Sequence, residues 1–231
     1  ISAVLDNEPG VVGAIENGKS TNDTTPTFNG TGEPGSTITV YNNSTILGTA
    51  KVDESGAWTF TPSTPLQDGT YAIRVTATDA AGNVSAPSGN FTFTVDAKAP
   101  DAPTFTAVID NSDGTNVTVA NGGATNDATP TITGKAEPGA LVTLWATLDG
   151  NRVELGTATA NAQGNWSITP GTPLAEGAYT LSVTATDSAG NVSPVTSEQS
   201  FTLDLSAPSA PGELAVSPDG NSVTGTAEAN S

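Results

Sequence analysis

The sequence has 231 residues, which is enough for about two domains of ordinary size. It contains 24 acidic and 6 basic residues, giving a net charge of −18, and it has no histidine, cysteine or methionine. These absences exclude disulfides, thiol nucleophiles, histidine-based catalysis and zinc sites with the usual ligands, and 6 cations are too few to neutralise many phosphates of a nucleic acid.

The acidic surface suits hard cations that prefer oxygen ligands, and calcium is the leading candidate. No apolar run approaches the ~20 residues of a membrane span, so we expect no membrane insertion. The chain begins at Ile1 without a visible signal peptide, and we expect it to be a segment of a longer protein.

Short segments of alternating polarity predict β-strands throughout the chain. In residues 37–40, 58–60, 71–79 and 91–95, every second side chain is apolar, and glycine or proline separates the segments. This spacing is typical of an antiparallel β-sandwich of about seven strands. Residues 66–71 and 174–179 each end in a tyrosine, and this pattern predicts a tyrosine corner in each unit.

An internal repeat divides the chain. Residues 21–27 (TNDTTPT) return almost unchanged at 125–131, and residues 76–85 return at 184–193. The proline-containing segment 96–103 returns at 204–211, where it predicts a short, stiff linker. We therefore expect one domain over residues 1–98, a second over 99–206, and the truncated start of a third over 207–231.

The combined motif order resembles bacterial immunoglobulin-like repeats. The order is T-N-D-x-T-P-T, then G-x-x-E-P-G, G-x-W, D/E-G-x-Y and T-A-T-D-x-A-G-N-V-S, and both full units carry it. Such repeats build the stalks of giant adhesins exported by type I secretion. The resemblance implies an all-β, elongated array of tandem immunoglobulin-like antiparallel β-sandwiches at the bacterial surface. It also implies a non-enzymatic monomer that contacts neighbouring repeats, supports adhesion to host cells or biofilm, and holds calcium near its domain joints.

Immunoglobulin-like topology predicts which acids meet at each joint. The A–B loop of one unit, the linker and the B–C and F–G turns of the next unit lie at the same end, and several carboxylates there would repel one another unless a divalent cation bound them. The expected ligands at the first joint are Asp6, Asp23, Asp96, Asp101, Glu137 and Asp187. Those at the second joint are Asp110, Asp127, Asp204 and Glu228, while Glu33 and Asp79 would face a preceding unit.

Other interpretations remain open from the sequence alone. Any one of these acids can instead cap a turn or keep the surface soluble. Tyr41 and Trp145 occupy outward positions of matched strands, where they could stack on a host glycan or contact a host protein. The chain could also be an accessory repeat of a secreted enzyme whose catalytic residues lie elsewhere. Residues 13–20 match the P-loop pattern, but no helix-forming segment follows, so an Asn-Gly turn is expected there.

Overall fold

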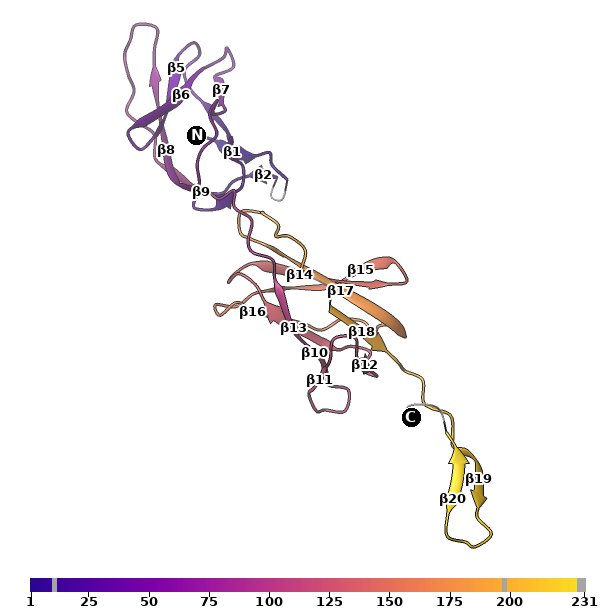
Figure 1. The fold of residues 1–231 in the computed structure, drawn as a ribbon. Coiled ribbons are helices and arrows are strands. Elements are labelled where there is room, and N and C mark those ends of the chain that lie inside the picture. The colour runs from indigo at the N-terminus through magenta and orange to yellow at the C-terminus, as the bar shows by residue number, and fades with distance from the viewer. Residues whose placement is uncertain (10–11, 197–198, 228–231) are drawn as a thin grey trace.

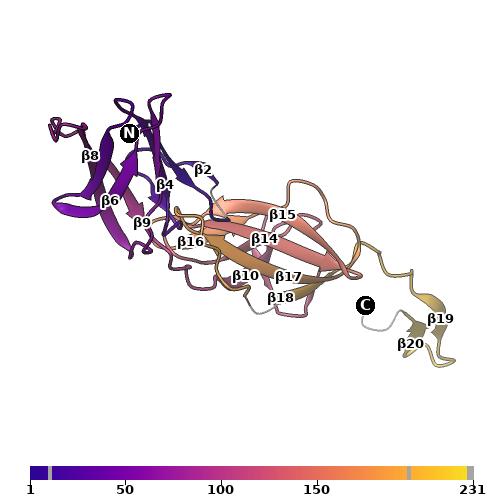
Figure 2. The ribbon, with the colours of Figure 1, turned by 90° about the horizontal axis from the view of Figure 1, so that it is seen from above.

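The structure, a computed structural model, describes residues 1–9, 12–196 and 199–227. Figures 1 and 2 show two β-sandwiches and a terminal hairpin following one another along the chain. All regular elements in the described residues are strands, as the alternating segments predict. The described part of the chain contains no helical segment that could cross a bilayer.

The first sandwich consists of two sheets that pack face to face. One has the strand order β2-β1-β4-β7 and the other has the order β3-β9-β8-β5-β6. The strands are β1 (Ala3–Asp6), β2 (Gly13–Ala14), β3 (Ser20–Thr21), β4 (Thr27–Thr31), β5 (Thr37–Asn42), β6 (Thr45–Lys51), β7 (Ala57–Phe60), β8 (Gly69–Thr78) and β9 (Phe91–Val95).

The second sandwich repeats this topology, which matches the internal sequence repeat. Its sheets have the orders β11-β10-β13-β16 and β12-β18-β17-β14-β15. The strands are β10 (Thr104–Asp110), β11 (Val117–Val119), β12 (Ala124–Thr125), β13 (Thr131–Lys135), β14 (Leu141–Leu148), β15 (Asn151–Thr159), β16 (Asn165–Ile168), β17 (Gly177–Thr186) and β18 (Gln199–Leu203).

Each unit contains two short strands in addition to the seven that the alternation predicts. Both come from the long connection between β1 and β4 or between β10 and β13. β3 pairs in parallel with β9, and β12 pairs in parallel with β18. This pairing moves the end of the connection from one sheet to the other, so it lies beside the strand that leads into the linker.

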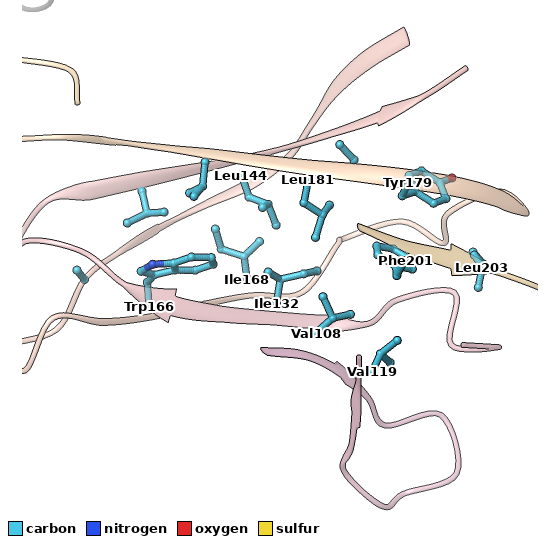
Figure 3. Packing of buried hydrophobic residues seen from close by; sticks show 14 residues of the cluster. Val108, Val119, Ile132, Leu144, Trp166, Ile168, Tyr179, Leu181, Phe201 and Leu203 are labelled. Atoms are coloured by element: carbon cyan, nitrogen blue, oxygen red, sulfur yellow. The ribbon is translucent and has the colours of Figure 1, made fainter. Parts of the chain in front are cut away.

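The side chains that alternate in the sequence form the cores. In the first unit Phe28, Ile38, Val40, Ile73 and Phe93 are at most 2% exposed. Figure 3 shows the second core, in which residues of β10, β13 and β16 face residues of β14, β17 and β18.

Both tyrosine corners are confirmed. The hydroxyl of Tyr71 donates to the carbonyl of Gln67, and that of Tyr179 donates to the carbonyl of Ala175, at 2.8 Å in each case. Each bond fixes the loop that enters the longest strand of its unit. The two corners therefore fold in the same way despite the differences in sequence between the copies.

The terminal hairpin of β19 (Gly212–Val216) and β20 (Val223–Thr226) keeps the register of the β10–β13 pair in the second unit. Val216 pairs with Val223 as Val108 pairs with Ile132, and both strand pairs have an irregularity after the next residue pair. The earlier pair is fully buried, whereas Val216 and Val223 are 66% and 67% exposed. The hairpin thus has the strand pairing of a sandwich sheet without an opposing sheet in the described residues.

Gly134 is the position where the second core tolerates least added volume. A Cβ there would lie 2.0 Å from the Thr104 carbonyl oxygen and 2.3 Å from the Trp166 ring. We expect Gly134→Ala to lower the free energy of unfolding by about 1–3 kcal/mol, the usual cost of overpacking. Gly171→Ala, with no atom within 4 Å of its Cβ, should change it by less than about 0.5 kcal/mol. Urea unfolding measures both, and equal effects would contradict the prediction.

Candidate functional site at the interdomain joint

Two carboxylates of the first unit are buried beside the start of the linker. Asp6 ends β1, Asp23 follows β3, and their side chains are only 1% and 2% exposed. The hydroxyl of Thr21 lies between them. It donates to Asp6 Oδ2 at 2.5 Å and accepts the Asp23 backbone N–H at 3.1 Å. The conformation of the loop is therefore fixed by its own polar groups.

The hydrogen bonds of these carboxylates come from neutral donors. Asp23 accepts the backbone N–H of Asn7 at 3.1 Å and that of Thr25 at 2.7 Å. These donors carry no charge, so they do not cancel the net charge of a carboxylate. The joint thus concentrates negative charge in a region from which much of the water is excluded.

One oxygen beside this pair has no partner among the described residues. The side-chain Oδ1 of Asn22 is buried without a hydrogen bond, while its Nδ2 donates to the carbonyl of Pro9 at 3.0 Å. A buried acceptor without a donor is unfavourable unless something else satisfies it. Carboxylate and amide oxygens are the ligands that a hard cation such as calcium prefers, so Asn22 Oδ1 and the two carboxylates are of a chemical type that suits such an ion.

The linker joins this loop to the second unit. The backbone N–H of Asp96 donates to the Thr21 carbonyl at 2.9 Å. The Asp96 carbonyl accepts Asn191 Nδ2 at 2.7 Å, and the same nitrogen donates to Asp187 Oδ2 at 2.8 Å. Of the six acids predicted for this joint, Asp6, Asp23, Asp96 and Asp187 therefore lie along one connected path of hydrogen bonds.

The other two predicted acids lie apart from this path. Asp101 and Glu137 are exposed, and with Thr104 and Lys135 they line an open depression of about 310 Å³. Within the described residues, no group of three or more acidic side chains is close enough together to hold a metal ion. A cation at the joint would therefore need carbonyl or amide oxygens as well as carboxylates.

The second joint repeats the loop of the first. Thr125 donates to Asp110 Oδ2 at 2.6 Å and accepts the Asp127 N–H at 3.1 Å, while its carbonyl accepts the Asp204 N–H at 3.0 Å. The bond from Thr125, with others from Ser112, lowers the pKa of Asp110, so this carboxyl group stays charged to a lower pH than a free aspartate. Glu228, predicted for this joint, lies outside the described residues.

The F–G turn of the first unit points away from both joints. Asp79 Oδ1 accepts the backbone N–H of Asn83 at 2.8 Å, and its Oδ2 accepts Asn83 Nδ2 at 2.7 Å. These bonds lower the pKa of the Asp79 carboxyl group. Glu33 is exposed in a nearby turn. Both residues lie at the amino end of the unit, as the topology predicts.

The outward aromatic side chains are covered by arginine. The Arg152 guanidinium lies 4.2 Å from the centre of the Trp145 ring, and the Arg74 guanidinium lies 5.7 Å from the centre of the Tyr41 ring. These contacts occupy the faces that the glycan interpretation requires. Sequence alternation placed both rings on the outer face but could not identify their partners.

The sequence-based ligand set omits three polar residues that connect the joint. Thr21 and Thr125 link the paired acids, and Asn191 links the linker to the second unit. Their recurrence in the T-N-D and D-x-A-G-N motifs is the signal that could have identified them. They were missed because neutral side chains are weak candidates for a cation site.

The chain is similar in sequence or fold to several known proteins. A segment of exoglucanase B from Cellulomonas fimi is 35% identical over 185 residues, which cover 76% of this chain but 15% of the exoglucanase. The solved tetra-tandem repeat from the extending region of a large adhesion protein is 25% identical, with a TM-score of 0.35 over 82% of this chain and 49% of that one. The BSP domain of a biofilm associated protein is 24% identical, with a TM-score of 0.32 over 83% and 30%.

The chain spans less than half the length of each of these relatives. The model of the bacterial Ig-like domain family matches two successive segments, residues 10–97 and 101–205. These segments make up most of the chain: the second spans its whole sandwich, and the first spans its sandwich except for β1. The protein therefore belongs to the bacterial Ig-like domain family and carries two such domains in tandem.

Proposed function

We propose that these domains are spacers in an extended bacterial surface adhesin, and that calcium at the joints holds neighbouring units in line. The observation that supports this most is the path of hydrogen bonds from Asp6 to Asp187, which ties loop, linker and next unit together. A spacer needs joints with a defined angle more than it needs a deep cavity, because the length of the array depends on how each domain is oriented relative to the next. The repeated loop at the second joint is consistent with the same role.

The donor set of the first joint supports calcium as the ion. A cation there would take carboxylate oxygens from at most two of Asp6, Asp23, Asp96 and Asp187, an amide oxygen from Asn22 Oδ1, and backbone carbonyl oxygens for the rest. Two unit charges 4 Å apart repel by about 4 kcal/mol at an effective dielectric constant of 20, and a bound divalent cation removes that cost. At about 1 mM extracellular calcium, sites with dissociation constants of about 10⁻⁴–10⁻³ M would be roughly half to nine-tenths filled.

A second candidate role is that of an accessory module in a secreted enzyme. The 35% identity with a segment of exoglucanase B supports it, since catalysis would then lie outside the shared segment. The requirement for a defined joint is the same in both roles, because in either protein the domains would separate a functional domain from its anchoring point. The sequence that flanks this chain in its parent protein distinguishes them.

Calcium binding at the two joints can be tested separately. We expect Asp23→Asn to remove a site at the first joint and Asp127→Asn to remove one at the second, because each loses a buried carboxylate charge while keeping its shape. Isothermal titration calorimetry with CaCl₂ measures the stoichiometry. Asp53→Asn, in a turn remote from both joints, is the matched control. Unchanged stoichiometry in both joint variants would refute these ligands.

Chelation should change both the stability and the shape of the chain. A site at ten times its dissociation constant stabilises the folded form by about 1.4 kcal/mol, so EDTA should lower the melting temperature by roughly 5–10 °C. It should also broaden the range of interdomain angles, which small-angle X-ray scattering records. Magnesium in place of calcium serves as the control. Identical scattering and melting curves with and without EDTA would contradict the proposal.

A further inference from the structure

We infer that the Asn191 side chain is a positioning residue that latches the second unit onto the linker without a metal ion. The inference deepens the proposed spacer function, because it assigns part of the stiffness of the joint to protein hydrogen bonds alone. The contact joins a side chain of the second unit to the peptide group of Asp96, two residues whose separation in sequence is 95. It therefore restricts the orientation of one unit relative to the other.

The geometry uses both hydrogens of a single amide nitrogen. Asn191 Nδ2 lies 2.7 Å from the Asp96 carbonyl oxygen and 2.8 Å from Asp187 Oδ2. Asp187 Oδ1 accepts the backbone N–H groups of Ala189 and Asn191, both at 2.9 Å. Asp187 thus fixes the turn and aims the amide at the linker, so little side-chain entropy is lost when the latch closes.

The other side of the latch is anchored in the first unit. The Asp96 N–H donates to the carbonyl of buried Thr21, and the next N–H, of Ala97, donates to Asp68 Oδ1 at 2.9 Å. The peptide group before Asp96 is therefore bound to the first unit, and the peptide group after it is bound to both units. A rotation of the chain at this residue must break at least one of these bonds.

The far end of the same linker is also held. The hydroxyl of Thr196 donates to the carbonyl of Pro103. Pro100 and Pro103 are buried at this joint, whereas Pro208 and Pro211, their counterparts at the second joint, are exposed. The second unit therefore fixes both ends of the segment that connects it to the first unit.

The first unit provides an internal comparison. Its F–G turn has the same hydrogen bonds, with Asn83 Nδ2 at 2.7 Å from Asp79 Oδ2, yet Asn83 is exposed and contacts no linker in the described residues. The turn therefore forms without a linker. The turn that carries Asn191 is therefore expected to have the same shape whether or not the linker is bound to it. Among the described residues, the Asp96 carbonyl is the acceptor that distinguishes the second turn from the first.

The test measures the interdomain distance in EDTA, where no divalent ion contributes. The chain has no cysteine, so Thr64→Cys and Thr172→Cys add a single pair of spin labels at exposed, equivalent positions of the two units. Pulsed electron–electron double resonance then gives the distribution of distances between the two spin labels. Loss of one net hydrogen bond should raise the population of bent joints roughly fivefold in Asn191→Ala.

The controls separate the latch from a local effect on the turn. Asn191→Asp keeps the shape but loses the donor, and it should broaden the distribution at least as much as Asn191→Ala. Asn83→Ala removes the same bond within a turn and should leave the distribution unchanged. Circular dichroism confirms folding of each variant, and if either Asn191 variant does not fold, the other provides the test.

The result distinguishes this inference from the calcium proposal. An unchanged distribution in a folded Asn191 variant, or equal broadening by Asn83→Ala, would overturn the latch. Narrowing of the wild-type distribution by added calcium bears only on the ion and leaves the latch standing. Broadening in Asn191→Ala in EDTA supports the latch even when calcium has no effect on the wild type.

Discussion

Burial of Thr21 is the constraint on which the joint depends. This residue is fully buried, its hydroxyl joins two acids, and its carbonyl receives the N–H of Asp96. Buried polar groups must be paired, so the loop, the last strand and the start of the linker have to adopt one arrangement together. Thr125 imposes the same arrangement at the end of the second unit. In each unit the hydrogen bond from the linker to the threonine carbonyl sets the direction in which the chain leaves the sandwich.

The electrostatics of the joint follow from that arrangement. Asp6 and Asp23 remain buried because neutral N–H and hydroxyl donors surround them. The donors compensate for lost water but leave the negative charge in place. The joint is thus a region where a cation would be stabilised and where the protein also supplies its own hydrogen bonds. The Asn191 contact acts on this hinge, and a bound ion would act on the same hinge.

The bacterial Ig-like sandwich is a scaffold whose chemistry lies at its two ends rather than in a cavity. Its faces are closed by hydrophobic packing, and the outward Trp145 ring is covered by Arg152. The hydrogen bonds that link two acids through a threonine recur at the end of both units. A closed sandwich of this kind does not by itself imply a function, which lies in sites built onto the fold.

The sequence by itself determined the strands, the tyrosine corners and the repeat, because alternation with period two and turn residues act locally. It also predicted that Asp6, Asp23, Asp96 and Asp187 lie at one joint, since strand order fixes where turns lie. Only the tertiary structure decided the parallel pairing of β3 with β9, the separation of Asp101 from Asp96, and the contact of Asn191 with the linker. These features depend on how two folded units approach each other, and residues 95 positions apart carry no local periodicity that records the approach.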